Sequence, residues 1–230
     1  MTAETLSVVN ALLLLNRILN PRNKSIVVKI TPLICLRGVL TYYEGKEYMD
    51  ILKKSAEVYR QYVDYNYTFL LDCELSITVA FRAAYFHHLV GLQYLTDIAQ
   101  VDKTRPNNSA TGIYKKILNG KITHELIQKS TFYEKIEERI AYFVELGEVI
   151  SSKFIIDFDY TKVPKTELMS KYLLYKQYEN GYAILGLKYD SINDVYIPET
   201  FIFNHSDYYI KEQISYNVIN VSSKHYRKTI

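Results

Sequence analysis

The sequence has no tryptophan and is short of cysteine, proline and glycine. Its 230 residues include two Cys, five Pro and eight Gly. Cys35 and Cys73 lack the Cys-x-x-Cys spacing of zinc and redox motifs, so we predict buried, unpaired thiols in a reducing compartment. So little proline and glycine leaves little room for long flexible linkers.

Long apolar runs are missing as well. The stretch Val8–Leu15 is too short to span a membrane, and Asn10, Asn16 and Arg17 interrupt or flank it. Glu4 stands where a signal peptide carries basic residues, and no small-residue cleavage site follows. We therefore expect no membrane partner and a cytoplasmic protein.

Neither sign of charge is in large excess. The formal net charge is +3 and the pI is about 8.6, which is too weakly basic to indicate nucleic-acid binding by itself. RNA stays a candidate partner if the positive charge gathers on one face. Patterns of the P-loop, GxGxxG and GxSxG types are absent, so nucleotide hydrolysis and α/β-hydrolase chemistry lack support.

The chain is rich in apolar residues and in tyrosine. An apolar fraction of 48% excludes a disordered chain. The 23 Tyr suit half-buried strand surfaces, which is the main explanation for the excess. Stacking against nucleobases is the alternative for a minority of them.

Apolar spacing predicts the order of the elements. We expect helices over 3–19, 47–63, 85–95, 110–118, 124–129 and 131–150. Alternating residues predict a hairpin of 67–71 and 75–81, strands over 153–156, 172–178, 182–189 and 195–203, and an edge strand over 216–221. The predicted fold is α+β, with helices on a mainly antiparallel sheet. Residues 1–45 would be an N-terminal extension of a helix and a candidate strand, and 46–230 the main domain.

The most concentrated chemistry is the pair His87–His88. Adjacent helical residues point about 100° apart, so one ring can turn inward while the other meets solvent. Such a pair chelates poorly, and no further ligands stand at metal-binding spacing, so we expect no metal and no cofactor. Two interpretations stay open: a core histidine beside an exposed one, or a general acid/base.

Basic and polar residues give further candidates. Lys115, Lys116 and Lys121 gather around Gly120, and they indicate either a phosphate contact or a solvated helix face. In the predicted strands, a polar group such as Thr200 could bind a phosphate oxygen or occupy the outward face.

Five segments then form a recognisable series. They are Phe86–Leu92, Ile117–Thr123, Ile136–Ile140, Lys171–Leu174 and Tyr196–Ile202. The most specific is the pattern Phe-x-His-Leu-x-Gly-Leu. Their order, from about Glu47 to Tyr216, resembles a phage-associated nuclease family of the barnase–EndoU–colicin–RelE type, the fourth of the phage groups so named.

The resemblance implies a metal-independent ribonuclease fold of the barnase/RelE-like type over residues 46–230. Families of this fold are thought to cut RNA by attack of the 2′-OH on the adjacent phosphate, which needs a base, an acid and cations. His87 falls at a variable place in the pattern and is expected to be a neighbour only. The catalytic candidates by resemblance are His88, Arg139, Tyr172 and Thr200, with Lys121 as a phosphate contact. Lys116, from the basic cluster around Gly120, is the second candidate phosphate contact.

Three functions follow from these patterns. The leading one is an RNA-cleaving, toxin-like effector of a phage or mobile element. The second is a non-catalytic module of the same fold that binds RNA or inhibits a host protein, and the third is a protein-binding structural component. Catalysis predicts that the four candidate side chains converge on one cleft. Partners would be RNA and either a protein inhibitor or a host protein, and the sequence leaves the oligomeric state open.

Overall fold

The computed structural model describes residues 50–226, which form an α+β fold as the sequence predicts. The predicted extension over residues 1–45, its boundary with the main domain, and Cys35 all lie outside the described residues. Within 50–226, no helix has the length and apolar character needed to cross a membrane.

Helices and strands follow one another in a mixed order. The α-helices are α2 (Ile51–Arg60), α3 (Phe86–Leu89), α4 (Ala110–Leu118), α5 (His124–Ile127), α6 (Glu137–Phe143) and α7 (Leu146–Ile150). The 3-10 turns are η1 (Ala83–Tyr85), η2 (Leu92–Tyr94), η3 (Tyr133–Lys135) and η4 (Tyr160–Lys162). The strands are β1 (Tyr65–Leu71), β2 (Ser76–Ala80), β3 (Phe154–Asp157), β4 (Tyr172–Tyr178), β5 (Gly181–Asp190), β6 (Val195–Asn204) and β7 (Ile214–His225).

The sheet closes on itself in the order β1-β2-β6-β5-β4-β3-β7. All pairings are antiparallel except the one between β2 and β6, which rests on Val79 and Tyr196. The expectation of a mainly antiparallel sheet is therefore confirmed. Closure into a seven-stranded barrel is a feature that the barnase/RelE-like expectation did not include.

Strand β7 is where the sequence prediction is wrong. It is not a short edge strand over 216–221, because it pairs with both β1 and β3 along Ile214–His225 and so closes the sheet. Pairings between residues so far apart in sequence leave no mark on local periodicity. The strand ends beside the start of β1, where Tyr226 N donates a hydrogen bond to Asp64 O over 2.7 Å.

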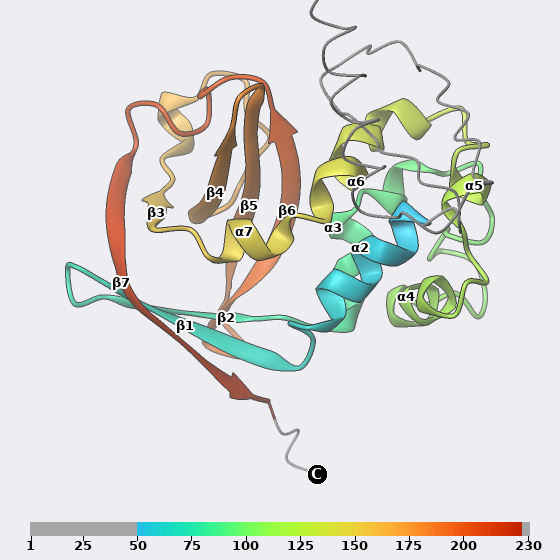
Figure 1. The fold of residues 1–230 in the computed structure, drawn as a ribbon, viewed down its shortest axis with the longest axis horizontal. Helices are drawn as coiled ribbons and strands as arrows, with labels where there is room; N and C mark the ends of the chain where they lie inside the picture. The colour runs from blue at the N-terminus through green and yellow to red at the C-terminus, as the bar shows by residue number, and fades with distance from the viewer. Residues whose placement is uncertain (1–49, 227–230) are drawn as a thin grey trace, which may run out of the picture. The chain divides into compact units, whose positions relative to one another are not determined.

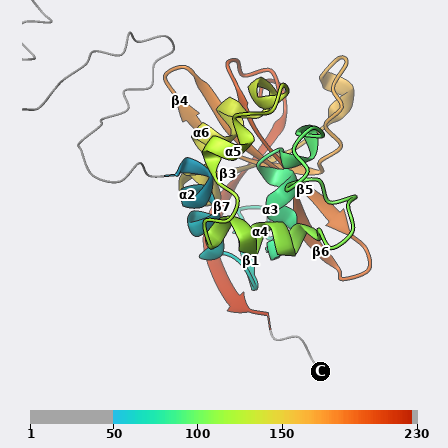
Figure 2. The same ribbon diagram turned by 90° about the vertical axis from the view of Figure 1, so that its right-hand side faces the viewer.

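The helices pack on one face of the strands. Figure 1 shows α2, α3, α4 and α6 beside β6, and Figure 2 shows them in front of the strands. The shared core is aromatic at its centre, where the fully buried rings of Tyr59, Phe86 and Phe143 contact one another and Phe201 packs against Phe143. The opposite face of the sheet carries a second, smaller core of Ile156, Phe158, Val163, Leu173 and Ile184.

Two long predicted helices are broken into shorter ones. The helix predicted over 85–95 stops at Leu89, because Gly91 takes a left-handed φ of 81°. The helix predicted over 131–150 divides into η3, α6 and α7, so that α6 packs on β6 and α7 on β4 and β5. Cys73 was predicted to be buried, but it lies exposed in the turn between β1 and β2.

Candidate active site

The two adjacent histidines divide as expected, one inward and one outward. His87 is 2% exposed, and its Nε2 lies 2.7 Å from Val101 O. Since a carbonyl can only accept, Nε2 must carry the proton in that hydrogen bond. His88 stays exposed on the outer side of α3. His87 is therefore a buried structural residue, and His88 is the ring that a substrate can reach.

Gly91 brings Arg139 next to His88. A Cβ at position 91 would lie 2.6 Å from Ile136 Cγ2 and 3.2 Å from Arg139 Cδ, so only glycine lets α6 approach this closely. Arg139 Nη1 then donates a hydrogen bond to His88 O over 3.4 Å. Its Cζ lies 5.5 Å from the centre of the Tyr94 ring. Arg139 is thus held beside His88 by the turn that follows α3.

Burial lowers the pKa of Arg139, while Tyr94 acts in the opposite direction. An arginine nevertheless keeps its charge at any physiological pH. The side chain is partly buried, so its field is less screened than that of a fully solvated cation.

A loop that begins at Val101 supplies a second cation. His87 holds the loop at Val101 O, and Asn108 Nδ2 donates to Ala99 O and Asp102 O over 2.9 and 3.1 Å. Lys103 lies in this loop and lowers the pKa of both His87 and His88. The loop therefore adds positive charge to the surroundings of His88.

A bulge in β6 supplies a carboxylate. Gly186 pairs with Thr200 and Leu187 with Pro198, which leaves Glu199 as an extra residue. The Glu199 carboxylate accepts a hydrogen bond from Ser170 Oγ over 2.9 Å and lies 3.6 Å from Lys188 Nζ. It also acts on His88, whose pKa it raises.

Thr200 follows Glu199 and shares a sheet face with Gly186. A Cβ at Gly186 would lie 2.9 Å from Thr200 Cγ2 and 2.3 Å from Ser170 Oγ, which places both side chains on the face opposite the main helical core. Tyr172 lies on the other face, in the main core, where it is 5% exposed and packs against the Tyr196 ring at 5.1 Å. Tyr172 and Thr200 therefore do not face a common cleft.

Burial, followed by Tyr196, raises the pKa of the Tyr172 phenol far above its usual value, so the phenol is neutral. The two predicted phosphate contacts lie on and after α4. Lys116 Nζ donates to Asn108 Oδ1 over 2.9 Å, and Lys121 is exposed behind the turn at Gly120. The roles of Tyr172, Lys116 and Lys121 stay predictions.

The environment of His88 keeps its ring neutral. Desolvation lowers the pKa below 6.5, Arg139 and Lys103 lower it further, and Glu199 acts in the opposite direction. Within residues 50–226, the rings of His87, His124 and His205 each have a hydrogen-bond partner, whereas the rings of His88 and His225 have none. A neutral imidazole with free nitrogens beside a fixed guanidinium can take a proton next to a bound phosphate.

The sequence left three members of this site unidentified. Tyr94 was placed in the helix predicted over 85–95, Lys103 fell between two predicted helices, and Glu199 fell within the strand predicted over 195–203. A loop lysine carries no periodic signal, and a bulge depends on the pairing of two strands. The one sequence signal at the bulge is the polar pair Glu199–Thr200 within an otherwise apolar strand.

Within the described part of the chain, no three His, Cys, Asp or Glu side chains lie close enough together to hold a metal ion. Comparison with known proteins finds no match among curated proteins and none among solved structures. The family model described as phage-Barnase-EndoU-ColicinE5/D-RelE like nuclease 4 matches residues 51–230, which includes every residue of the site described above. The chain therefore belongs to this phage-associated nuclease family.

Proposed function

We propose that the protein cuts RNA without a metal ion, as a cytoplasmic effector of a phage or mobile element. The observation that carries the proposal is the pairing of His88 with Arg139. The imidazole of His88 is exposed and neutral, and the backbone carbonyl of the same residue accepts a hydrogen bond from the Arg139 guanidinium. Membership of a nuclease family supports it.

In the proposed reaction, His88 takes the proton from a ribose 2′-OH. The 2′-oxygen forms a bond to the adjacent phosphorus, the bond from phosphorus to the 5′-oxygen breaks, and water protonates the leaving oxygen. Arg139 and Lys103 stabilise the added negative charge on the phosphorane oxygens. The role of Thr200 as a phosphate contact stays a prediction, because its side chain lies on the sheet face opposite the main helical core. The products carry a 2′,3′-cyclic phosphate and a 5′-hydroxyl.

The test is incubation of the full chain with RNA in the presence of EDTA. We expect His88→Ala to lower the cleavage rate roughly 10²- to 10⁴-fold and Arg139→Gln roughly 10²- to 10³-fold. His205→Ala and Arg60→Gln are matched controls, because both residues are exposed and lie outside the site. Cleavage that is equal in wild type and His88→Ala would contradict the proposal.

A non-catalytic RNA-binding module of the same fold is the alternative. One observation favours it: Tyr172 and Thr200 lie on opposite faces of the sheet, so the predicted set of four does not line one cleft. Under this alternative the wild type binds RNA and leaves it intact, and Arg139→Gln weakens binding without any change in RNA length. An RNA gel shift run beside the cleavage assay separates the two.

A further inference from the structure

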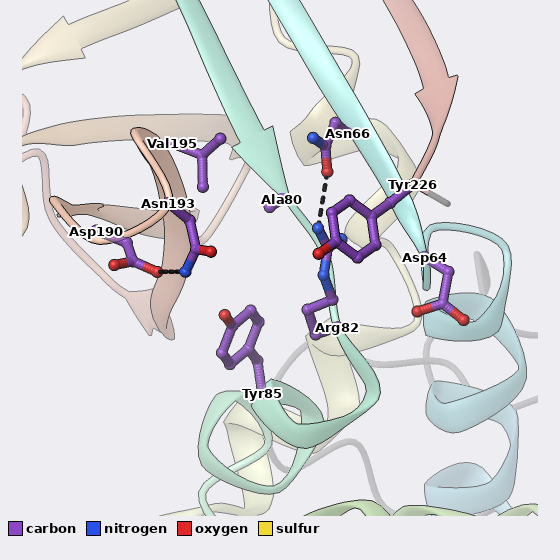
Figure 3. A pocket seen from close by; sticks show the side chains of 9 residues that line it. All are labelled: Asp64, Asn66, Ala80, Arg82, Tyr85, Asp190, Asn193, Val195 and Tyr226. Atoms are coloured by element: carbon purple, nitrogen blue, oxygen red, sulfur yellow. Dashed lines mark hydrogen bonds between the residues drawn. The ribbon is translucent and has the colours of Figure 1, made fainter. Parts of the chain in front are cut away.

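A pocket of about 560 Å³ is lined mainly by polar side chains. It lies where β1 begins and β2, β5 and β7 end, and where the β5–β6 turn and η1 come together (Figure 3). A cavity of this size can enclose a small molecule. Its lining residues, which together we call the Arg82 pocket, are Asp64, Asn66, Ala80, Arg82, Tyr85, Asp190, Asn193, Val195 and Tyr226.

Arg82 is fixed in place by neutral groups. Its Nη1 donates to Phe81 O over 2.9 Å and its Nη2 to Asn66 Oδ1 over 3.0 Å, while the Tyr226 ring lies 4.0 Å from its Cζ. Among the ion pairs of residues 50–226, none includes Arg82. A guanidinium has five N–H donors, so donors remain for an anionic ligand and no bound carboxylate competes for them.

The wall opposite Arg82 suits a nucleobase. Figure 3 shows the Tyr85 ring between Arg82 and the pair Asp190–Asn193. Asn193 Nδ2 and Ile192 N donate to the Asp190 carboxylate over 2.7 and 3.1 Å, and these contacts lower its pKa, so it is charged. An aromatic face beside amide and carboxylate groups offers both stacking and hydrogen bonds to a base edge.

A second hollow continues from the pocket. It is lined by Asn66, Lys224, His225 and Tyr226, so it shares two residues with the Arg82 pocket. Lys224 pairs across the strands with Asn66, which also accepts the hydrogen bond from Arg82. Lys224 therefore shares the face of Asn66, and it places a further positive charge beside the pocket, which suits a polyanionic strand.

The pocket and the His88 site belong to one stretch of chain. Tyr85 and His88 are three residues apart in η1 and α3, and α3 packs on β6. Val195 lines the pocket and Glu199 acts on His88, and along β6 these two residues are about 13 Å apart. One extended nucleic-acid strand can span that distance with a few nucleotides.

We propose that the Arg82 pocket binds one nucleotide of a single-stranded RNA, a short distance along the strand from the nucleotide that is cut at His88. The base stacks on Tyr85 with its edge toward Asp190 and Asn193, and the phosphate contacts Arg82. The RNA substrate class rests on the proposed function, whereas the nucleotide-binding property of the pocket does not.

The test is titration of the full chain with each of the four nucleoside 5′-monophosphates, and separately with inorganic phosphate, by calorimetry. We expect at least one nucleotide to bind more tightly than phosphate. Arg82→Gln should weaken that binding roughly 10- to 100-fold, through loss of charge-assisted hydrogen bonds. Arg82→Lys keeps the positive charge but loses the planar set of N–H donors, so it should also weaken nucleotide binding.

Tyr85→Leu, which keeps an apolar side chain but removes the ring, should weaken nucleotide binding and leave phosphate binding unchanged. Arg60→Gln is the matched control for loss of one positive charge, because this exposed residue at the end of α2 lies outside the pocket. Thermal melts of each variant identify any that fails to fold.

His88→Ala should bind the nucleotide as the wild type does. If no nucleotide binds, if phosphate binds as tightly as every nucleotide, or if folded Arg82 and Tyr85 variants bind like the wild type, the proposal is overturned. Failure of RNA cleavage with intact nucleotide binding counts against the proposed function alone.

Discussion

His88 lies among charges of both signs, and they make its ionisation a sensitive test of the site. Lys103 lowers its pKa and Glu199 raises it. We predict that Lys103→Gln raises the pKa of His88 and that Glu199→Gln lowers it, as measured by NMR titration of the imidazole. If both substitutions leave the titration unchanged, these side chains do not face His88.

The same titration predicts the pH dependence of cleavage. A base must be neutral to act, so the rate should fall on the acid side with the lowered pKa of His88, at a pH below 6.5. Lys103→Gln should move this acid limb to higher pH. A merely structural lysine would change the rate without moving the limb.

Gly91 is the residue that allows Arg139 to approach His88. Its φ is 81°, and a Cβ at this position would lie 2.6 Å from Ile136 Cγ2, so there is no space for a side chain. Gly91→Ala should lower the free energy of unfolding by roughly 1–3 kcal/mol, measured by urea denaturation, and should displace Arg139 and reduce cleavage. Gly120→Ala is the control, because it shares a positive φ but has nothing within 4 Å of the added Cβ. Equal losses in both variants would show that backbone strain alone is responsible.

At the scale of elements, the buried ring of His87 ties α3 to the loop that carries Lys103. Desolvation lowers the pKa of His87 below the usual 6.5, although its hydrogen bond to Val101 O opposes this. As the pH falls through about 6.5, His87 therefore becomes protonated in the unfolded chain, while it stays neutral in the folded chain. The stability from a neutral His87 is complete above pH 6.5 and is lost as the pH falls through the lowered value.

We predict that His87→Gln makes the free energy of unfolding less dependent on pH between 7.5 and 5. It should also cost roughly 1–3 kcal/mol at pH 7.5, if the amide does not restore the hydrogen bond to Val101 O. Urea denaturation at the two pH values measures both effects, with His205→Gln at an exposed position as the control. A wild-type slope in the His87 variant would contradict this account.

Local patterns predicted the elements whose structure is local. Strand β4 has the predicted bounds, and the β1–β2 hairpin follows from alternating apolar residues around a short turn. Ser109 is the N-cap of helix α4, and its side chain accepts a hydrogen bond from Gly112 N over 3.0 Å. The helix predicted over 131–150 failed because α6 and α7 contact different strands of a curved sheet, a requirement that helical periodicity does not contain.

Only the part of the site that lies within one short segment of the sequence was predictable. His88 and Gly91 stand in a single motif, so their proximity follows from the sequence. Arg139 came from the resemblance, and its contact with His88 O depends on how α6 packs against Gly91. Lys103 and Glu199 reach the site through a loop and a bulge, which only the folded chain specifies.

At the scale of the whole molecule, the closed sheet supports the site from one side. Strand β7 joins β1 to β3, so the end of the described chain lies beside the Arg82 pocket, while α3 and α6 meet β6 farther along. The arrangement places the Arg82 pocket and His88, the proposed acid/base residue, along one strand. The central claim is that His88 promotes attack by a 2′-hydroxyl.

The most direct measurement uses an RNA oligonucleotide with a single cleavage site, and a copy that carries 2′-deoxyribose at the nucleotide preceding the cut. Both are incubated with the full chain in EDTA, and the products are identified by mass spectrometry. We predict a 2′,3′-cyclic phosphate and a 5′-hydroxyl from the RNA, no cut at that position in the 2′-deoxy copy, and a rate roughly 10²- to 10⁴-fold lower for His88→Ala. Cleavage of the 2′-deoxy copy at the same position, or an unchanged rate in His88→Ala, would contradict the claim.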